Sequence, residues 1–199
     1  MALPTPPVYI SAEEYLRVER EADFKSEYVD GRIYAMSGGS PAHQTIAFNL
    51  TGELYSQLRD APCRGFTSDA KVRTPTDNLY TYPDLTVVCG EPVYADAKGD
   101  VLDNPVLIVE ILSPTTEAFD RGRKFARYQE IVTLTDYVLI AQNEPRVEHF
   151  VRQPDGSWNL RPYTGLEASV SITSINCSLL LARIYDRVEF ASLTGLRLE

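Results

Sequence analysis

Two short apolar segments that each carry one carboxylate restrict the fold more than any other feature of the sequence. Residues 82–88 read Tyr-Pro-Asp-Leu-Thr-Val-Val and hold Asp84, and residues 106–114 read Val-Leu-Ile-Val-Glu-Ile-Leu-Ser-Pro and hold Glu110. Their β-branched, aliphatic composition is typical of strands that are buried on both faces. A buried carboxylate without a partner is costly, so each is expected to be neutralised, paired with a cation or bound to a metal.

The two carboxylates are expected to lie close together on neighbouring strands. Asp84 follows a proline, which keeps the preceding residue extended, and Glu110 ends a run of four aliphatic residues. Two such strands side by side would hold both acids over one point, which suits a hard divalent cation such as Mg²⁺ or Mn²⁺. The alternative for Asp84 is a strand-end carboxylate that caps a nearby turn.

A helix is expected after the Glu110 strand, over residues 116–128. Asp120, Lys124 and Tyr128 follow one another at intervals of four, which puts them on one helical face. That face is predicted to look back at the two carboxylates. Asp120 would then fix the lysine in place, and Tyr128 would either hydrogen-bond a phosphate or pack against the helix.

These residues together resemble the Uma-type putative restriction endonucleases of the PD-(D/E)XK nuclease superfamily. Pro83-Asp84, Glu110 within Val-Glu-Ile-Leu-Ser-Pro, and the later Asp120, Lys124 and Tyr128 carry the resemblance, which extends from about residue 9 to residue 188. One position departs from the superfamily pattern, because Leu112 stands where a lysine is expected two residues after Glu110. The resemblance implies that Lys124 takes the place of that lysine.

The resemblance also implies a function, a metal site and further site residues. Asp84, Glu110 and the backbone carbonyl of Ile111 would bind Mg²⁺, and Lys124 would assist the attacking water during hydrolysis of a phosphodiester bond in DNA. Glu27 matches an acidic residue that the family carries in a hairpin near the metal. His43 matches a histidine that follows a Ser-Pro-rich loop, where it would contact the substrate.

Glu27 and His43 also have simpler interpretations from the sequence alone. Residues 25–36 alternate apolar and polar side chains around Asp30-Gly31, which predicts a hairpin, so Glu27 could be an exposed strand carboxylate. A helix is predicted from the loop at residues 37–41 to about Leu58, with His43 near its start. That end of a helix favours anions, although a single histidine more often makes a local hydrogen bond.

The fold class that this order of elements predicts is α/β. A mixed central sheet flanked by helices, with additional β-hairpins, would form one nuclease-like domain over residues 1–199. The chain has 199 residues of which 44% are hydrophobic, enough for one substantial core. A homodimer is expected by analogy, since cutting both strands of a duplex requires two sites.

The charge of the chain counts against strong non-specific binding to nucleic acids. Its formal net charge is −9 and its pI about 4.8, whereas such binding depends on Lys and Arg. A basic cluster can still be local, and one follows Glu110 in the predicted helix. It is either a phosphate contact or a solvated helix face, and it consists of Arg121, Arg123, Lys124 and Arg127.

Several other segments carry expectations that the structure can test. Ser11 to Glu14 form a capping box, which predicts a helix that ends at about Glu21. Residues 63–73 are predicted to form one strand, with Lys71 and Arg73 facing away from the core. Residues 91–104 are predicted to form a loop. Lys71 and Arg73 would serve solubility or contact phosphate. Residues 178–185 read as a short helix, and His149 and Trp158 are expected to pack or stay at the surface.

The cysteines and the N-terminus predict a cytoplasmic protein. Cys63, Cys89 and Cys177 are odd in number and lack metal-ligand spacing, so they are expected to be buried thiols in a reducing compartment. Residues 1–7 contain no signal-peptide pattern, and no apolar run reaches the roughly 18 residues that a membrane helix needs.

Two alternative functions remain open on the sequence. The chain could be a catalytically inactive binding module on a nuclease fold, in which the acids still bind a cation or a partner. It could also hydrolyse small phosphate esters, which would require a closed pocket. A serine hydrolase is not indicated, because Gly-x-Ser-x-Gly is absent from the sequence.

Overall fold

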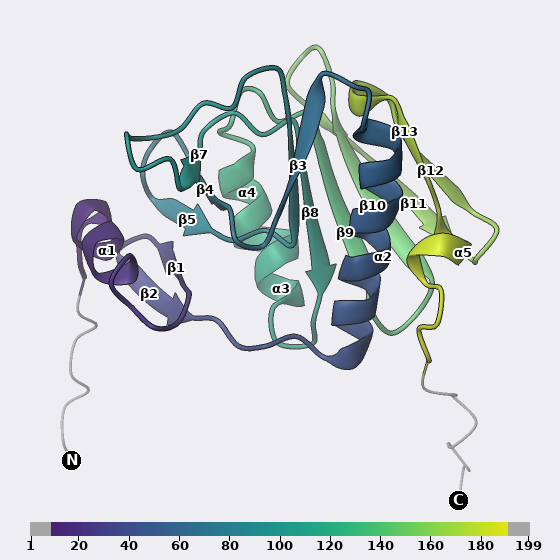
Figure 1. The fold of residues 1–199 in the computed structure, drawn as a ribbon, viewed down its shortest axis with the longest axis horizontal. Helices are drawn as coiled ribbons and strands as arrows, with labels where there is room; N and C mark the ends of the chain where they lie inside the picture. The colour runs from purple at the N-terminus through teal and green to yellow at the C-terminus, as the bar shows by residue number, and fades with distance from the viewer. Residues whose placement is uncertain (1–8, 191–199) are drawn as a thin grey trace, which may run out of the picture.

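A six-stranded sheet runs through the middle of the molecule in the computed structural model, which describes residues 9–190 (Figure 1). Only β8 and β9 pair in parallel; the other neighbouring strands are antiparallel. The predicted mixed sheet of an α/β fold is therefore confirmed. In pairing order the strands are β11 (Trp158–Thr164), β10 (Arg146–Arg152), β9 (Asp136–Ala141), β8 (Leu107–Leu112), β6 (Leu85–Cys89) and β3 (Cys63–Thr67).

A second sheet of five short strands lies beside the first, and helix α1 (Ala12–Glu19) packs on it (Figure 1). Its first two strands form the predicted hairpin, and the turn residues Asp30 and Gly31 both have positive φ, 46° and 84°. Two such residues match the right-handed twist of a hairpin, which explains why Asp-Gly occurs here. In pairing order the strands are β2 (Arg32–Ala35), β1 (Ser26–Val29), β5 (Leu79–Thr81), β4 (Lys71–Arg73) and β7 (Val101–Leu102).

Helix α2 (Pro41–Leu58) covers one face of the six-stranded sheet, as predicted from its apolar stripe. Its buried residues recur every four positions: Ile46, Leu50, Leu54 and Leu58. The same core includes residues from the C-terminal elements β12 (Ser169–Ile172), η2 (Thr173–Ile175), β13 (Cys177–Leu180) and α5 (Leu181–Ile184). The predicted helix over residues 178–185 was therefore partly wrong, because its first half is a strand.

The other face of the sheet packs against the second sheet and a helical segment after β8. That segment consists of α3 (Glu117–Phe119), a π-helical turn η1 (Asp120–Lys124) and α4 (Phe125–Tyr128). Side chains alternate along β8: Val109 and Ile111 belong to the core under α2, whereas Ile108 and Leu112 belong to the core on the opposite side. Glu110 therefore points toward the helical segment and the second sheet.

The segment over residues 63–73 corrects the sequence-based prediction. It forms two strands, β3 and β4, which belong to different sheets, instead of one continuous strand. Lys71 was expected to face away from the core, yet it is 1% exposed and its ammonium lies 2.6 Å from Glu19. Arg73 pairs with Asp103 and Asp77. Neither side chain is thus a free cation, because acids neutralise both: Glu19 pairs with Lys71, and Asp103 and Asp77 pair with Arg73.

The cysteines correct a second prediction. Cys63 and Cys89 were expected to be thiols, but they lie opposite each other on β3 and β6 and form a disulfide bond. Cys177 is a free, buried cysteine as expected. Within residues 9–190 no helix has both the length and the apolar character needed to cross a bilayer. The expectation for residues 1–7 lies outside the described residues.

A buried ion pair fastens α1 to the second sheet, and its removal should cost stability. We expect Lys71→Ala to lower the free energy of unfolding by about 3 kcal/mol, because it leaves Glu19 buried without a cation. Urea unfolding at neutral pH measures this difference. Lys98→Ala, which removes an exposed lysine, is the control and should stay within about 0.5 kcal/mol of the unmodified protein. Equal losses in both variants would contradict the role given to the pair.

Candidate active site

The ammonium group of Lys124 lies among three carboxylates from three different elements. Its Nζ is 3.0 Å from Oε1 of Glu27 on β1, 3.0 Å from Oε1 of Glu110 on β8, and 3.4 Å from Oδ1 of Asp120 within η1. The Lys124 side chain is only 5% exposed. The structure thus brings together four residues that the sequence selected, and it turns the lysine inward as the helical spacing predicted.

Glu110 is held on its other side by a chain of two hydroxyls. Tyr128 donates a hydrogen bond of 3.0 Å to Oε1 of Glu110, and Oγ1 of Thr81 lies 2.6 Å from the Tyr128 hydroxyl. Tyr128 is completely buried. Since its single hydroxyl proton goes to the carboxylate, Thr81 donates to Tyr128. In this position Tyr128 fixes the orientation of Glu110, and a direct contact with a phosphate would require its side chain to move.

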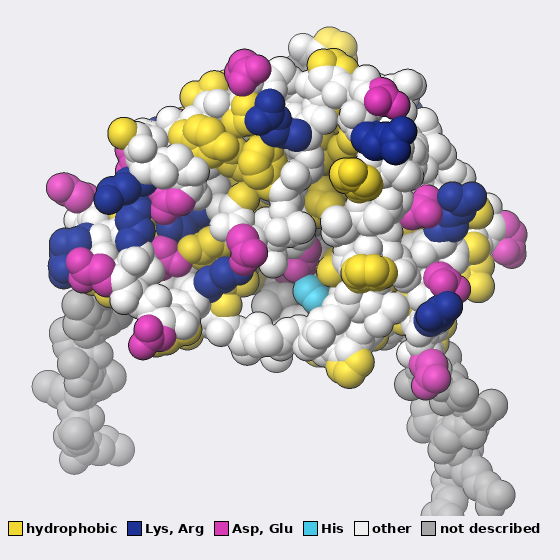
Figure 2. Space-filling model, in the orientation of Figure 1, with side chains coloured by type: hydrophobic (Ala, Val, Ile, Leu, Met, Phe, Trp, Pro, Cys, Tyr) yellow, Lys and Arg dark blue, Asp and Glu magenta, His cyan; other side chains and the backbone are white. Residues whose placement is uncertain are grey.

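Asp84 directly precedes β6, and a hydrogen bond joins its side chain to the backbone of β8 at Ile111, the residue after Glu110. Its Oδ2 accepts a hydrogen bond of 2.6 Å from the backbone N–H of Ile111, and its Oδ1 lies 3.1 Å from Nε2 of His43. The Asp84 and His43 side chains are 16% and 20% exposed, so this end of the cluster is open to solvent. Figure 2 shows a hollow on the face of the molecule that it draws, and a histidine and acidic side chains lie inside this hollow.

The pKa values in this cluster are shifted in directions that follow from burial and charge. Burial raises the pKa of the Glu110 carboxyl well above its ordinary range, although Lys124 opposes the shift. Burial would lower the pKa of the Lys124 ammonium, but Glu110, Glu27 and Asp120 together raise it well above its ordinary range. Burial also raises the pKa of Asp120. The hydrogen bond to Asp84 raises the pKa of His43.

The cluster has more negative than positive charge, which favours the binding of a divalent cation. Glu27, Asp84, Glu110 and Asp120 oppose one ammonium, which gives a formal charge of −3 when all are ionised and His43 is neutral. So much uncompensated charge in a buried site favours protonation or a bound cation. Within residues 9–190 no three His, Cys, Asp or Glu side chains are grouped to hold one metal ion. A Mg²⁺ site needs fewer, because this ion binds through one or two carboxylates and keeps several waters.

Two glycines precede His43, and one of them is required by close packing. A Cβ atom added to Gly39 would lie 2.6 Å from Nδ1 of His43, whereas one added to Gly38 would meet nothing within 4 Å. Gly39 therefore leaves room for the histidine ring that reaches Asp84. Sequence reasoning missed this role, as it missed Thr81, because neither residue belongs to a motif. The helix cap Ser40, which bonds to Gln142 beyond β9, was missed for the same reason.

The predicted basic cluster is mostly neutralised by acids. Arg121 pairs with Glu117 and Glu148, and Arg127 pairs with Asp30 and Glu130. His149 is buried beside Asp136, and Trp158 packs on Phe125, so both have structural positions as expected.

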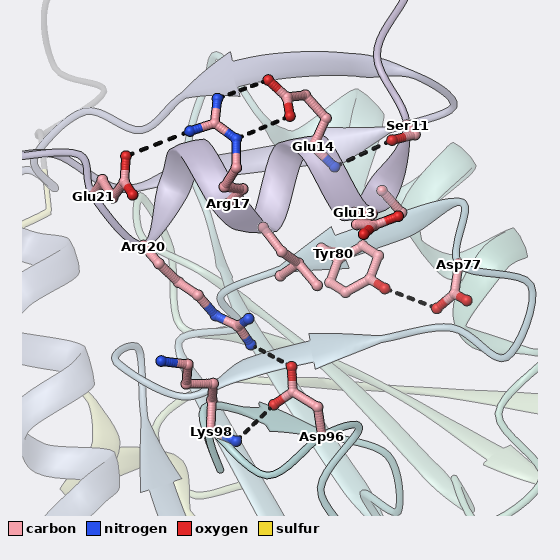
Figure 3. A pocket seen from close by; sticks show the side chains of 12 residues that line it. Ser11, Glu13, Glu14, Arg17, Arg20, Glu21, Asp77, Tyr80, Asp96 and Lys98 are labelled. Carbon is pink, nitrogen blue, oxygen red and sulfur yellow. Dashed lines mark hydrogen bonds and ion pairs between the residues drawn. The ribbon is translucent and has the colours of Figure 1, made fainter.

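A pocket of about 700 Å³ lies elsewhere, between α1 and the loop at residues 96–98 (Figure 3). Most of its charged side chains pair with one another: Arg17 bonds Glu14 and Glu21, and Arg20 bonds Asp96 (Figure 3). A second pocket of about 320 Å³ lies between α2 and β3. Neither contains a residue of the Lys124 cluster. The candidate site is thus a polar recess and not one of these two cavities.

The shifted pKa of Glu110 predicts how stability depends on pH in the absence of metal. The folded protein retains a proton on Glu110 that the unfolded chain releases near pH 4.5. This contribution to stability is therefore complete below about pH 4.5 and is lost as the pH rises through the raised pKa. We expect urea unfolding in EDTA between pH 5 and 8 to show this decline, and Glu110→Gln to reduce it. A matched exposed change, Glu91→Gln, should leave the slope unaltered; a Glu110→Gln variant with the original slope would contradict the assignment.

The contact of Gly39 with His43 gives a prediction that needs no substrate. We expect Gly39→Ala to push the imidazole away from Asp84 and to move the pKa of His43 down toward its ordinary 6.5, since the bond to Asp84 is what raises it. An NMR titration of the ring protons measures this, because the chain has only two histidines. Gly38→Ala is the control. An unchanged His43 pKa in Gly39→Ala would show that the ring is not held there.

Comparisons with known proteins agree with this architecture. A protein-family model named Uma2, described as "Putative restriction endonuclease", matches residues 12–181. Two uncharacterized proteins of Synechocystis sp. are similar over most of their length: slr1290 is 36% identical over 91% of this chain and 94% of its own, and sll1609 is 35% identical over 82% and 93%.

A solved structure shares the fold. The crystal structure of a protein from Anabaena variabilis, described as a putative nuclease belonging to DUF820, superposes with a TM-score of 0.73 at 19% identity, covering 88% of this chain and 97% of that one. At this identity the likeness concerns the fold alone. The match over residues 12–181, together with two relatives above 30% identity, establishes that the chain belongs to the Uma2 family of putative restriction endonucleases.

Proposed function

We propose that the protein is a metal-dependent endonuclease that hydrolyses phosphodiester bonds in DNA. The observation that carries the proposal is the buried Lys124 ammonium, 3.0 Å from Glu110 and supplied by the helical segment after β8. Leu112, at the position where the superfamily pattern has its lysine, is buried in the apolar core. The site therefore has the two acids and one cation of this nuclease chemistry, with the cation coming from a different element. Family membership supports the same class of activity.

The acids that remain available fit a hard cation. The hydrogen bond of Tyr128 and the ion pair of Lys124 both use Oε1 of Glu110, and no hydrogen bond within residues 9–190 reaches Oε2. Oε2, Oδ1 of Asp84 and the carbonyl of Ile111 would hold Mg²⁺ or Mn²⁺. When bound, such an ion polarises a phosphoryl oxygen and makes a water more acidic.

Lys124 acts beside the reacting phosphate in this proposal. Its ammonium would orient the attacking water and stabilise the negative charge that develops on the phosphoryl oxygens. Asp120 and Glu27 keep the side chain extended toward Glu110, so the charge is pre-positioned and needs no rearrangement during the reaction. Tyr128 and Thr81 hold the Glu110 carboxylate in one rotamer.

His43 is the contact for substrate at the solvent-facing end. Asp84 raises its pKa, which keeps a proton on the imidazole to higher pH. A protonated His43 near the start of α2 would donate to a phosphate oxygen of the substrate, and the positive end of the helix would add to the attraction. Binding a phosphate there brings the scissile bond to Asp84 and Glu110.

The remaining parts of the proposal concern the assembly and the location. Where a duplex substrate is opened locally, two copies would be required to cut both of its strands, so we include a homodimer of this single-domain chain in the proposal. We also retain the cytoplasm as its location, although the disulfide of Cys63 and Cys89 removes the argument from reduced thiols.

A cleavage assay tests the proposal directly. The protein is incubated with supercoiled, linear duplex and single-stranded DNA in Mg²⁺ or Mn²⁺, and products are resolved on gels. We expect cleavage that EDTA stops, and a loss of at least about a hundredfold in kcat/KM for Glu110→Gln and for Lys124→Met, since each removes a charged group from the reacting site. Lys98→Met and Glu91→Gln, both exposed and remote from the cluster, should retain full activity.

The outcome also separates the alternatives. A protein that binds DNA but never cleaves any of these forms would be a catalytically inactive binding module on the nuclease fold. Hydrolysis of small phosphate esters with no cleavage of DNA would indicate the other enzyme class. Cleavage that persists in Glu110→Gln would show that the activity comes from elsewhere.

A further inference from the structure

A row of exposed side chains on β2 lies next to the candidate site. β2 pairs antiparallel with β1 in a register that sets Tyr34 directly opposite Glu27. Directly opposed residues of such a pair project to the same face, with Cβ atoms about 5 Å apart. Because Glu27 points at Lys124, Tyr34 projects to the same side, at the rim of the recess.

Tyr34 remains 45% exposed in this position. A single exposed aromatic residue is ordinary on a protein surface and by itself requires no function. The position of Tyr34 relative to the candidate site is what suggests a role in binding. It stands at the outer edge of the second sheet, since β2 is an end strand, and the loop that follows leads to Gly39 and His43. A substrate strand that extends from His43 along this loop toward β2 would reach the Tyr34 ring.

Arg32 lies on the same face of β2, two residues before Tyr34. It donates a hydrogen bond of 3.0 Å to the hydroxyl of Tyr9, and its guanidinium lies 5.3 Å from the centre of the Tyr9 ring. Among residues 9–190 no Asp or Glu forms an ion pair with Arg32. Arg64, Arg123 and Arg161 likewise form no ion pair within these residues, so what distinguishes Arg32 is its place on the same face of β2 as Tyr34. In this acidic chain, Arg32 is a cation beside the site whose charge is left for an anion.

The burial of the reacting groups limits which substrates can reach them. The side chains of Glu110 and Lys124 are 5% exposed, while Asp84 and His43 nearer the opening are 16% and 20% exposed. A flexible single strand can bend its backbone into a recess of this kind, whereas a stacked duplex holds its phosphates on a rigid cylinder. The geometry favours a strand that is locally unpaired.

We propose that Arg32 and Tyr34 bind the nucleotide that flanks the scissile phosphate, Tyr34 by stacking on an unpaired base and Arg32 by contacting a phosphate. Stacking on an aromatic side chain needs the face of a base that is free of its duplex neighbours. The surface would therefore select single-stranded or locally unpaired DNA. This inference rests on the proposed nuclease function and specifies its class of substrate.

Equilibrium binding tests the surface separately from cleavage. Fluorescence anisotropy of a labelled 12-nucleotide oligodeoxythymidylate, and of a blunt duplex of equal length, is measured with the full chain in Ca²⁺. We expect the single strand to bind more tightly than the duplex, Tyr34→Ala to weaken single-strand binding about tenfold, and Tyr34→Phe to retain it. Arg32→Gln should weaken binding and lower the salt dependence by about 0.7 of a counterion. Tyr55→Ala, which removes a more exposed ring, 68% against 45% for Tyr34, from the far part of α2, is the control.

The possible results separate this inference from the proposed function. The proposed binding surface of Arg32 and Tyr34 is overturned if the single strand does not bind, or binds more weakly than the duplex. It is also overturned if Tyr34→Ala leaves single-strand binding unchanged. Both conclusions hold even if the unmodified protein cleaves DNA. Binding that depends on Tyr34 in a protein that cleaves nothing supports the surface and overturns the endonuclease. A Tyr34→Ala variant that dissociates a dimer and keeps its affinity for the oligonucleotide shows that the ring is a contact between copies, and overturns the surface as well.

Discussion

The interaction on which the site depends is the neutralisation of Lys124 by acids from separate parts of the chain. A buried ammonium is stable only if carboxylates surround it, and the surrounding carboxylates are stable only if the ammonium is there. Glu27 comes from the five-stranded sheet, Glu110 from the six-stranded sheet, and Asp120 from the helical segment between them. The ion cluster is therefore also the place where these three units are joined through polar contacts, within an otherwise apolar interface.

The apolar interface also explains why the pKa values of Glu110 and Asp120 are raised. Aliphatic and aromatic side chains exclude water from one side of Glu110, and the excess of acids over cations is not compensated inside the protein. Arrangements in which titratable groups shift one another are common at functional sites, because chemistry at neutral pH needs them. A structural salt bridge alone would be served by equal numbers of opposite charges. The surplus of negative charge beside an open end is what favours the binding of a cation.

Much of the fold followed from local patterns in the sequence. The Asp30-Gly31 hairpin, the four-residue stripe of α2 and the apolar β8 and β9 strands were predictable, since turn chemistry and periodicity act over a few residues. The single strand expected over residues 63–73 was wrong because the partner of each half is decided by distant segments. Lys71 was misplaced for the same reason, as its acid partner Glu19 lies in the first helix. The disulfide of Cys63 and Cys89 depended on strand register, which spacing does not reveal.

The site residues were partly predictable for a different reason. Asp84, Glu110 and Lys124 stand out because charges interrupt apolar segments or repeat at helical spacing, and the resemblance to a family added Glu27 and His43. The π-helical turn over Asp120–Lys124, the space left by Gly39 and the hydroxyl of Thr81 carry no such signal. These features arise only when the sheets and helices are packed, so they belong to the tertiary structure and not to any short stretch of sequence.

The distribution of the cluster along the chain has a consequence during synthesis. Glu27 is made early, but the strand with Glu110 and the segment with Lys124 follow only in the second half, and β9, which pairs with β8, comes later still. A ribosome-bound chain therefore carries no assembled ion cluster until most of the protein has emerged. If the protein is the DNA endonuclease proposed above, an incomplete chain on the ribosome therefore lacks the groups that would cut DNA.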